Sequence, residues 1–412
     1  MQYPNSISGL QEQLEAVPSD LVDTDITNLA KVLIAGAEAL DLGKLEHLGV
    51  SFRYKGVERN YDNPVEFTHE GVIGAPWADD AACPLQPGEQ WNEGRRATNT
   101  GTVYEFDVNG RPINPYMNTG LTGRGSLGVY GPNHAVDNGV IIIHPDGSGV
   151  PAAYATLGIL RKFDNNAPAF AGGFAKFQET DEGGFVLDTH AIIQSRMEEF
   201  FEEMISGSIP LSKENEKKVE PALQNVIAQK MARNGGIVLK EADIEEMCDQ
   251  TITAFKLQQV QQEDPGFLDR LYEVIATGKE CFAGPVLNDN RNTNQAWIET
   301  RLSWFLMDDA TWQYIRGENP KYDYKFSPGD DASDVKLLRL DADLIRDAFA
   351  SHGPMFAFMA ASFLLDRQEK GIAVEPSIMA QMRDIGRYLK SCTAGVKPTV
   401  QDTTPAAPVT PL

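Results

Sequence analysis

The stretch that decides the fold covers residues 171–203 and reads AGGFAKFQETDEGGFVLDTHAIIQSRMEEFFEE. It begins with a glycine pair, continues through a short loop and ends in a predicted helix that Asp188 is suited to cap. Glu199, Glu202 and Glu203 occupy positions i, i+3 and i+4, so their carboxylates share one helical face. Such charges repel unless a cation lies among them, and the pattern indicates either a site for Mg²⁺ or Mn²⁺ or a solvated acidic face.

The composition restricts the classes of partner. The 412 residues include 36 Lys plus Arg and 59 Asp plus Glu, which gives a formal net charge of −23. This charge argues against binding to nucleic acid or to an anionic membrane, whereas a metal and a few local arginines would still admit an anionic small molecule. The sequence does not predict an oligomeric state.

The four cysteines are widely scattered, which argues against a zinc site and against a disulfide framework. The N-terminal residues have no basic, apolar or Arg-rich character typical of a targeting segment. The most apolar run, residues 356–365, is about half of the ~20 residues that a membrane helix needs. A cytoplasmic protein is therefore expected.

Composition and periodicity divide the chain into five parts. Strands are predicted in the loop-rich region at 65–74, 102–108 and 140–145, and a polar helical segment follows the acidic helix. The predicted parts are an N-terminal helical extension (1–48), an N-terminal lobe (49–150), a main domain (151–355) with a helical insertion at about 208–262, C-terminal helices (356–391) and a disordered Pro/Thr/Ala-rich tail (392–412).

A glycine-rich segment, residues 114–138, contains Arg124 and His134. Glycines let backbone N–H groups approach a phosphate, but no strand and helix flank this segment in the manner of a dinucleotide-binding motif. On composition alone, an irregular packed loop with a buried histidine is the favoured interpretation.

The glycine pair, loop and acidic helix resemble a Nudix box. Five residues separate Gly173 from Glu179, as they separate the first glycine and the first glutamate of that motif. Residues 199–203 (EFFEE) match the end of the motif. About eleven additional residues separate Glu179 from the helix, and Glu198 stands where the family has an arginine. Five flanking blocks occur in the family's order, namely 57–79, 109–137, 289–300, 329–335 and 349–356.

These blocks resemble the ADP-ribose pyrophosphatase subgroup of the Nudix family, and also the ADP-ribose-sensing Nudix domain of melastatin-type TRP channels. The resemblance covers roughly residues 50–355 without the insertion. It implies an α+β fold, in which a Nudix α/β/α sandwich carries an N-terminal loop- and strand-rich lobe and a helical insertion. It also implies that the glycine-rich segment belongs to the substrate site.

The resemblance further implies metal-dependent hydrolysis of the diphosphate of ADP-ribose to AMP and ribose 5-phosphate. Glu199, Glu202 and Glu203 would be catalytic residues and ligands of Mg²⁺ or Mn²⁺, which activates a water. The residues implied in substrate binding are Arg124, His134, Gly173, Asp289, Arg291, Phe349 and Ser351.

Several alternatives stay open at this point. Arg291 and Asp289 also suit a structural ion pair, and His134 suits a structural role in the interior. Glu198 favours a hydrolytically weak ADP-ribose-binding sensor, whereas the three retained glutamates favour an enzyme. The insertion and Asn118, which replaces a family arginine, leave room for another nucleoside diphosphate derivative as the substrate.

Overall fold

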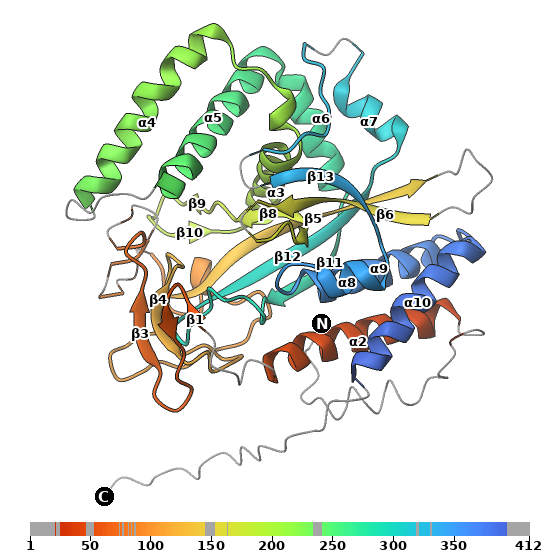
Figure 1. Ribbon diagram of the computed structural model, residues 1–412, viewed down its shortest axis with the longest axis horizontal. Helices are drawn as coiled ribbons and strands as arrows, with labels where there is room; N and C mark the ends of the chain where they lie inside the picture. Colours follow the sequence, from red (N-terminus) through yellow and green to blue (C-terminus); the bar gives the residue numbers. More distant parts are fainter. Residues whose placement is uncertain are drawn as a thin grey trace, which may run out of the picture.

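The computed structural model describes most of the chain between residues 21 and 393 (Figure 1). The segments outside the described residues are 1–20, 22–24, 47–52, 74, 76–77, 81, 84, 86–87, 145–152, 163, 234–240, 319–320, 330–331 and 394–412. Residues 394–412 of the predicted C-terminal tail and the start of the N-terminal extension lie outside the described residues, whereas residues 392 and 393 belong to a helix.

A mixed β-sheet forms the middle layer of the fold. The strand order along its main path is β11-β12-β5-β6-β13, with β8 paired to β5 and β7 paired to β6. Among the described strands of this sheet, β12 and β5 run parallel and the other pairs are antiparallel. The strands are β5 (Gly131–His144), β6 (Ala153–Arg161), β7 (Pro168–Ala169), β8 (Ala171–Phe174), β11 (Lys279–Pro285), β12 (Ala296–Leu306) and β13 (Ala332–Arg339).

Helices cover both faces of this sheet, as Figure 1 shows. On β5, Val140 belongs to the core under α3 and α6, and its neighbour Ile141 belongs to the core under α2, α9 and α10. This alternation follows from the two-residue repeat of a strand. The helices are α2 (Ile26–Glu46), α3 (Thr189–Met204), α6 (Pro265–Ala276), α7 (Asp309–Arg316), α8 (Ala342–Asp347), α9 (His352–Glu369) and α10 (Pro376–Thr393).

The three layers confirm the expected α+β class. The predicted insertion forms two long helices, α4 (Lys213–Arg233) and α5 (Glu241–Glu263), which pack on one another. Helices α2, α9 and α10 share one core with the sheet, so segments from both ends of the described chain build the same layer. Among the helices of the described chain, none is long and apolar enough to cross a membrane.

The loop-rich lobe contains short strands beside the main sheet. The strand predicted at 102–108 is wrong, because the structure has only an isolated bridge between Phe106 and Pro112 in this segment. Val103 is 76% exposed, and the rings of Tyr104 and Phe106 pack on Trp91. The short elements of the lobe are β1 (Arg53–Tyr54), β2 (Val57–Glu58), β3 (Val65–Thr68), η2 (Gly94–Arg96) and β4 (Leu121–Gly125). Three further short elements lie outside the lobe, namely β9 (Gln178–Glu179), β10 (Phe185–Val186) and η3 (Ser206–Ser208).

Candidate functional site

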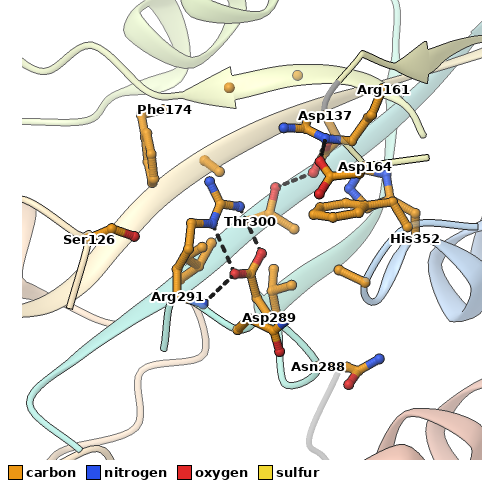
Figure 2. Close-up of a pocket in the computed structure, with 18 of the residues that line it drawn as sticks. Ser126, Asp137, Arg161, Asp164, Phe174, Asn288, Asp289, Arg291, Thr300 and His352 are labelled. Atoms are coloured by element: carbon orange, nitrogen blue, oxygen red, sulfur yellow. Dashed lines mark hydrogen bonds and ion pairs between the residues drawn. The ribbon is translucent and has the colours of Figure 1, made fainter. Parts of the chain in front are cut away.

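A cleft of about 820 Å³ lies between the sheet and the loops at its edge. Its floor contains Asp137 of β5 and Thr300 of β12, and Gly172 and Gly173 of β8 line it next to the acidic helix. Arg161, at the end of β6, and Arg291, in the β11–β12 loop, enter it from different sides (Figure 2). A polar cleft with several convergent charged groups is the default candidate for a ligand site.

Asp289 and Arg291 form a two-pronged ion pair inside this cleft. The Nε and Nη2 atoms of Arg291 donate to the two carboxylate oxygens of Asp289, at 2.9 and 2.7 Å. Burial alone would raise the pKa of Asp289, but the charge and hydrogen bonds of Arg291 outweigh it and lower that pKa. The ion pair that the sequence allowed is therefore present on the cleft wall, and the substrate contact stays a prediction.

Asp137 is a cleft residue that the sequence analysis missed. Its carboxylate accepts a hydrogen bond from Oγ1 of Thr300 at 2.5 Å, and the side chain is almost fully buried. Burial raises the pKa of Asp137 to about 6. A charged residue within the apolar strand 135–143 was the available signal, because acidic residues are rarely buried without a specific role.

The glycine pair joins the cleft to the acidic helix. The backbone N–H of Gly172 donates to Oε2 of Glu203 at 2.7 Å, and Glu203 is buried. A Cβ atom at position 173 would lie 2.5 Å from the carboxylate carbon of Glu199. At position 172 a Cβ atom would lie 2.3 Å from the backbone carbonyl oxygen of Val136, so each glycine makes room for a different neighbour.

Helix α3 begins as predicted, because Oδ1 of Asp188 accepts from the N–H of Ala191 at 2.8 Å. Glu198, which stands where the family has an arginine, forms an ion pair with Lys176 and accepts from Gln194 at 2.7 Å. Burial alone would lower the pKa of Lys176, but Glu198, with smaller effects from Glu202 and Glu199, raises it. Lys176 thus places a positive charge beside the acidic face.

Arg196 lies two residues before Glu198 on helix α3. It is buried, and its Nη2 donates to the carbonyl of Ser303 on β12 at 3.1 Å. Burial lowers its pKa to about 10. Its side chain therefore belongs to the interface between the helix and the sheet.

The donor chemistry at the glycine pair fits a hard divalent cation, since carboxylate oxygens of Glu199 and Glu203 reach the same two backbone residues. Within the described parts of the chain, however, no group of three or more His, Cys, Asp or Glu side chains is close enough together to hold a metal ion. The metal site at Glu199, Glu202 and Glu203 therefore stays a prediction.

The other predicted substrate residues fall in different places. Phe349 lines the cleft, and the guanidinium of Arg161 lies 4.6 Å from the centroid of its ring. Ser351 is buried behind the cleft, where its Oγ donates to Asp41 at 2.7 Å and accepts from the N–H of Asn288 at 3.1 Å. Ser351 thus fixes the loop that carries Asp289.

His134 lies in a second cavity, of about 270 Å³, beside the main cleft. Phe174 lines both spaces, and the His134 ring lies 5.6 Å from that of Phe177. Neither ring nitrogen of His134 has a hydrogen-bond partner in the described chain, and burial lowers its pKa to about 4.

Arg124 lies outside the cleft, and the structure gives it a structural position. It is 2% exposed, and its Nη1 donates to the carbonyl oxygens of Asp79 and Gly128. The glycine-rich segment is thus a packed part of the lobe, and only its Ser126, Ala135 and Asp137 line the cleft.

Three relatives and one family model match this chain. Residues 54–131 match the NUDT9-like N-terminal domain. The chain is 32% identical over 179 residues to the mitochondrial ADP-ribose pyrophosphatase of Rattus norvegicus. This match covers 40% of this chain and 47% of that protein. It is 34% identical over 151 residues to putative nudix hydrolase 6 of Caenorhabditis elegans, and this match covers 36% of this chain and 52% of that protein.

The third relative is transient receptor potential cation channel subfamily M member-like 2 of Nematostella vectensis, 26% identical over 303 residues. That match covers 70% of this chain and 15% of the channel protein. The chain spans about half the length of the two shorter relatives.

Proposed function

We propose that this chain, which belongs to the Nudix family and is ADP-ribose pyrophosphatase-like, hydrolyses the diphosphate of ADP-ribose to AMP and ribose 5-phosphate. The observation that carries the proposal is the position of the glycine pair. Glu203 is bound to the N–H of Gly172, and Gly173 faces both Glu199 and the cleft that contains Arg291. This arrangement brings the acidic helix to the edge of a cleft that can receive an anionic substrate.

The proposed roles follow from the chemistry of a diphosphate. Glu199, Glu202 and Glu203 would hold Mg²⁺ or Mn²⁺, which would neutralise the diphosphate and lower the pKa of a bound water. A carboxylate of this group accepts the proton of the attacking water, whose oxygen joins one phosphorus as the P–O bond to the other phosphate breaks. Arg291, fixed by Asp289, supplies a charge-assisted hydrogen bond to the anionic substrate.

The second cavity is the proposed site of the adenine base. Its wall contains His134, Phe174 and Phe177, which offer ring faces and a neutral imidazole that can donate or accept one hydrogen bond. Because Phe174 also lines the cleft, a base in the cavity and a diphosphate in the cleft can belong to one ligand. Phe349, at another part of the cleft, is proposed to pack on the terminal ribose.

The test is AMP formation from ADP-ribose and Mg²⁺ by the purified chain and by a Glu202→Gln/Glu203→Gln variant. The wild type should form AMP and the variant should lose at least about a hundredfold in kcat. Saturable ADP-ribose binding without AMP would refute the enzyme, and AMP formation unaffected by the double change would refute the site. Lys218→Gln, on the exposed helix α4, is the control.

A binding module without efficient hydrolysis is the second candidate, and the Lys176–Glu198 ion pair favours it. Lys176 adds positive charge beside the glutamates that are proposed to hold the cation. Calorimetry distinguishes the two candidates: a pure sensor would bind ADP-ribose with and without Mg²⁺ and release no AMP over hours. Rapid turnover would exclude it.

A further inference from the structure

Arg161 is held in a fixed position on the wall of the cleft. It is the last residue of β6, and its Nε donates to Oδ2 of Asp164 at 2.8 Å. Its guanidinium carbon lies 4.6 Å from the centroid of Phe349, so an aromatic face supports the charged group. An arginine restrained in this way loses little further entropy when it binds a ligand.

Most of its donors remain available for a ligand. Within the described chain, Nη1 and Nη2 of Arg161 have no hydrogen-bond partner, although the side chain is only 21% exposed. Figure 2 shows its guanidinium reaching across the pocket near Asp137, on a different side from Arg291. The two arginines therefore approach the same space from two walls.

The charge of the cleft calls for both arginines. Asp137, Asp164 and Asp289 line the cleft together with the cationic residues Arg161, Arg291 and Lys55, of which Lys55 is exposed. A diphosphate ester carries two negative charges, which these carboxylates would repel. If it bound beside Arg291 alone, the wall that carries Arg291 would offer it one arginine. Arg161 supplies a second planar fork, which suits the oxygens of a phosphate.

We propose that Arg161 binds a phosphate oxygen of the substrate's diphosphate from the wall opposite Arg291, so that the two guanidinium groups clamp the diphosphate. This inference rests on the proposed function. It assigns Arg161 a positioning role in substrate binding, because its contact with the diphosphate exists before and during the reaction. The loss of such a contact raises KM and leaves kcat nearly unchanged.

The experiment compares wild type with Arg161→Gln and Arg161→Met, of which the second keeps apolar packing on Phe349. KM and kcat for ADP-ribose, the Kd of ADP-ribose by calorimetry, and Tm are measured for each. Arg339→Gln on β13 is the control, since this arginine is 69% exposed and lies outside the cleft lining. Both Arg161 variants should raise KM and Kd by about tenfold or more, with kcat within about threefold and Tm close to wild type.

A KM and Kd equal to wild type in either folded variant would overturn the proposal. A fall in kcat with unchanged KM would also overturn it, since it would give Arg161 a structural or transition-state role instead. If one Arg161 variant has a lowered Tm, the KM and Kd of the other variant decide whether the proposal holds. If the wild type neither binds nor hydrolyses ADP-ribose, the proposed function has failed. If the wild type is active and an Arg161 variant binds ADP-ribose equally well, only the proposal for Arg161 has failed.

Discussion

The N–H of Gly172 donates a hydrogen bond to Oε2 of Glu203, with 2.7 Å between the two atoms. This bond ties strand β8 to the last turn of helix α3 and holds one of the three glutamates of the acidic face inside the protein. Glu202, its neighbour on the same face, is only half-buried. The two glutamates therefore differ in how much of their role is structural.

Replacement of Glu203 by alanine should destabilise the fold. The Gly172 N–H would lose its acceptor, and the expected decrease in the free energy of unfolding is about 1–2 kcal/mol. Glu203→Gln keeps a carbonyl oxygen and should lose less stability. Glu202→Gln is the matched control and should leave stability unchanged while lowering AMP formation. Urea denaturation checks these values, and equal stability of the Glu203→Ala variant and wild type would contradict the structural bond.

The two glycines of the pair should respond differently to alanine. A Cβ at position 172 would overlap the carbonyl oxygen of Val136, which the strand pairing holds in place. Gly172→Ala should therefore lower the free energy of unfolding by about 1–3 kcal/mol. At position 173 the obstacle is the carboxylate of Glu199, a side chain that can rotate away. Gly173→Ala should keep stability and lose most AMP formation, because it displaces a proposed ligand.

Thermal unfolding and AMP release measured on the same samples separate these two effects. Gly184→Ala, at a position where a Cβ meets only ordinary contacts, is the control and should change neither quantity. Equal losses of stability in the two alanine variants would contradict this account.

Local signals predicted the acidic helix well. Asp188 caps α3 as expected, and the apolar positions of the helix face the core. These features depend on residues within one or two turns of each other, so the sequence itself contains the information. The α+β class followed from the resemblance to the Nudix family, which rests on sequence blocks spread along the chain.

The cleft was harder to predict because it is assembled from distant segments. Arg161 ends an ordinary strand and has no sequence neighbour that marks it as a cleft residue. The charge of Asp137 within an apolar strand is a signal of a buried acidic residue, but it does not identify the cleft. Arg124 was expected at the substrate, yet carbonyl groups of Asp79 and Gly128 hold it in the interior. Whether Arg124 or Arg161 faces the cleft depends on how the lobe packs on the sheet, which is not visible in the residues next to either arginine.

Asp137 should make stability depend on pH. Burial raises its pKa to about 6, above the ~3.9 of an unfolded chain, so the folded state favours the protonated form. Its contribution to stability is full below about pH 4 and is lost as the pH rises through about 6. Asp137→Asn lacks the buried charge and should be more stable than wild type at pH 8, by on the order of 2–3 kcal/mol, and about equal at pH 4. Chemical denaturation of both proteins across this range gives the answer, and a constant difference between their stabilities would contradict it.

Lys176 should set how much Mg²⁺ the acidic helix requires. Its ammonium pairs with Glu198 and is 59% exposed, so its effect on a nearby cation is moderate and screened by salt. Lys176→Gln removes this positive charge and should lower the Mg²⁺ concentration for half-maximal AMP formation by about two- to fivefold at low salt, with less change at 0.3 M salt. The Mg²⁺ concentration that raises Tm halfway should shift in the same direction, which tests the cation site without turnover. Lys218→Gln removes a lysine paired with Glu214 on α4 and should shift neither midpoint. An unchanged or higher Mg²⁺ requirement in Lys176→Gln would mean that the cation binds away from Glu199, Glu202 and Glu203.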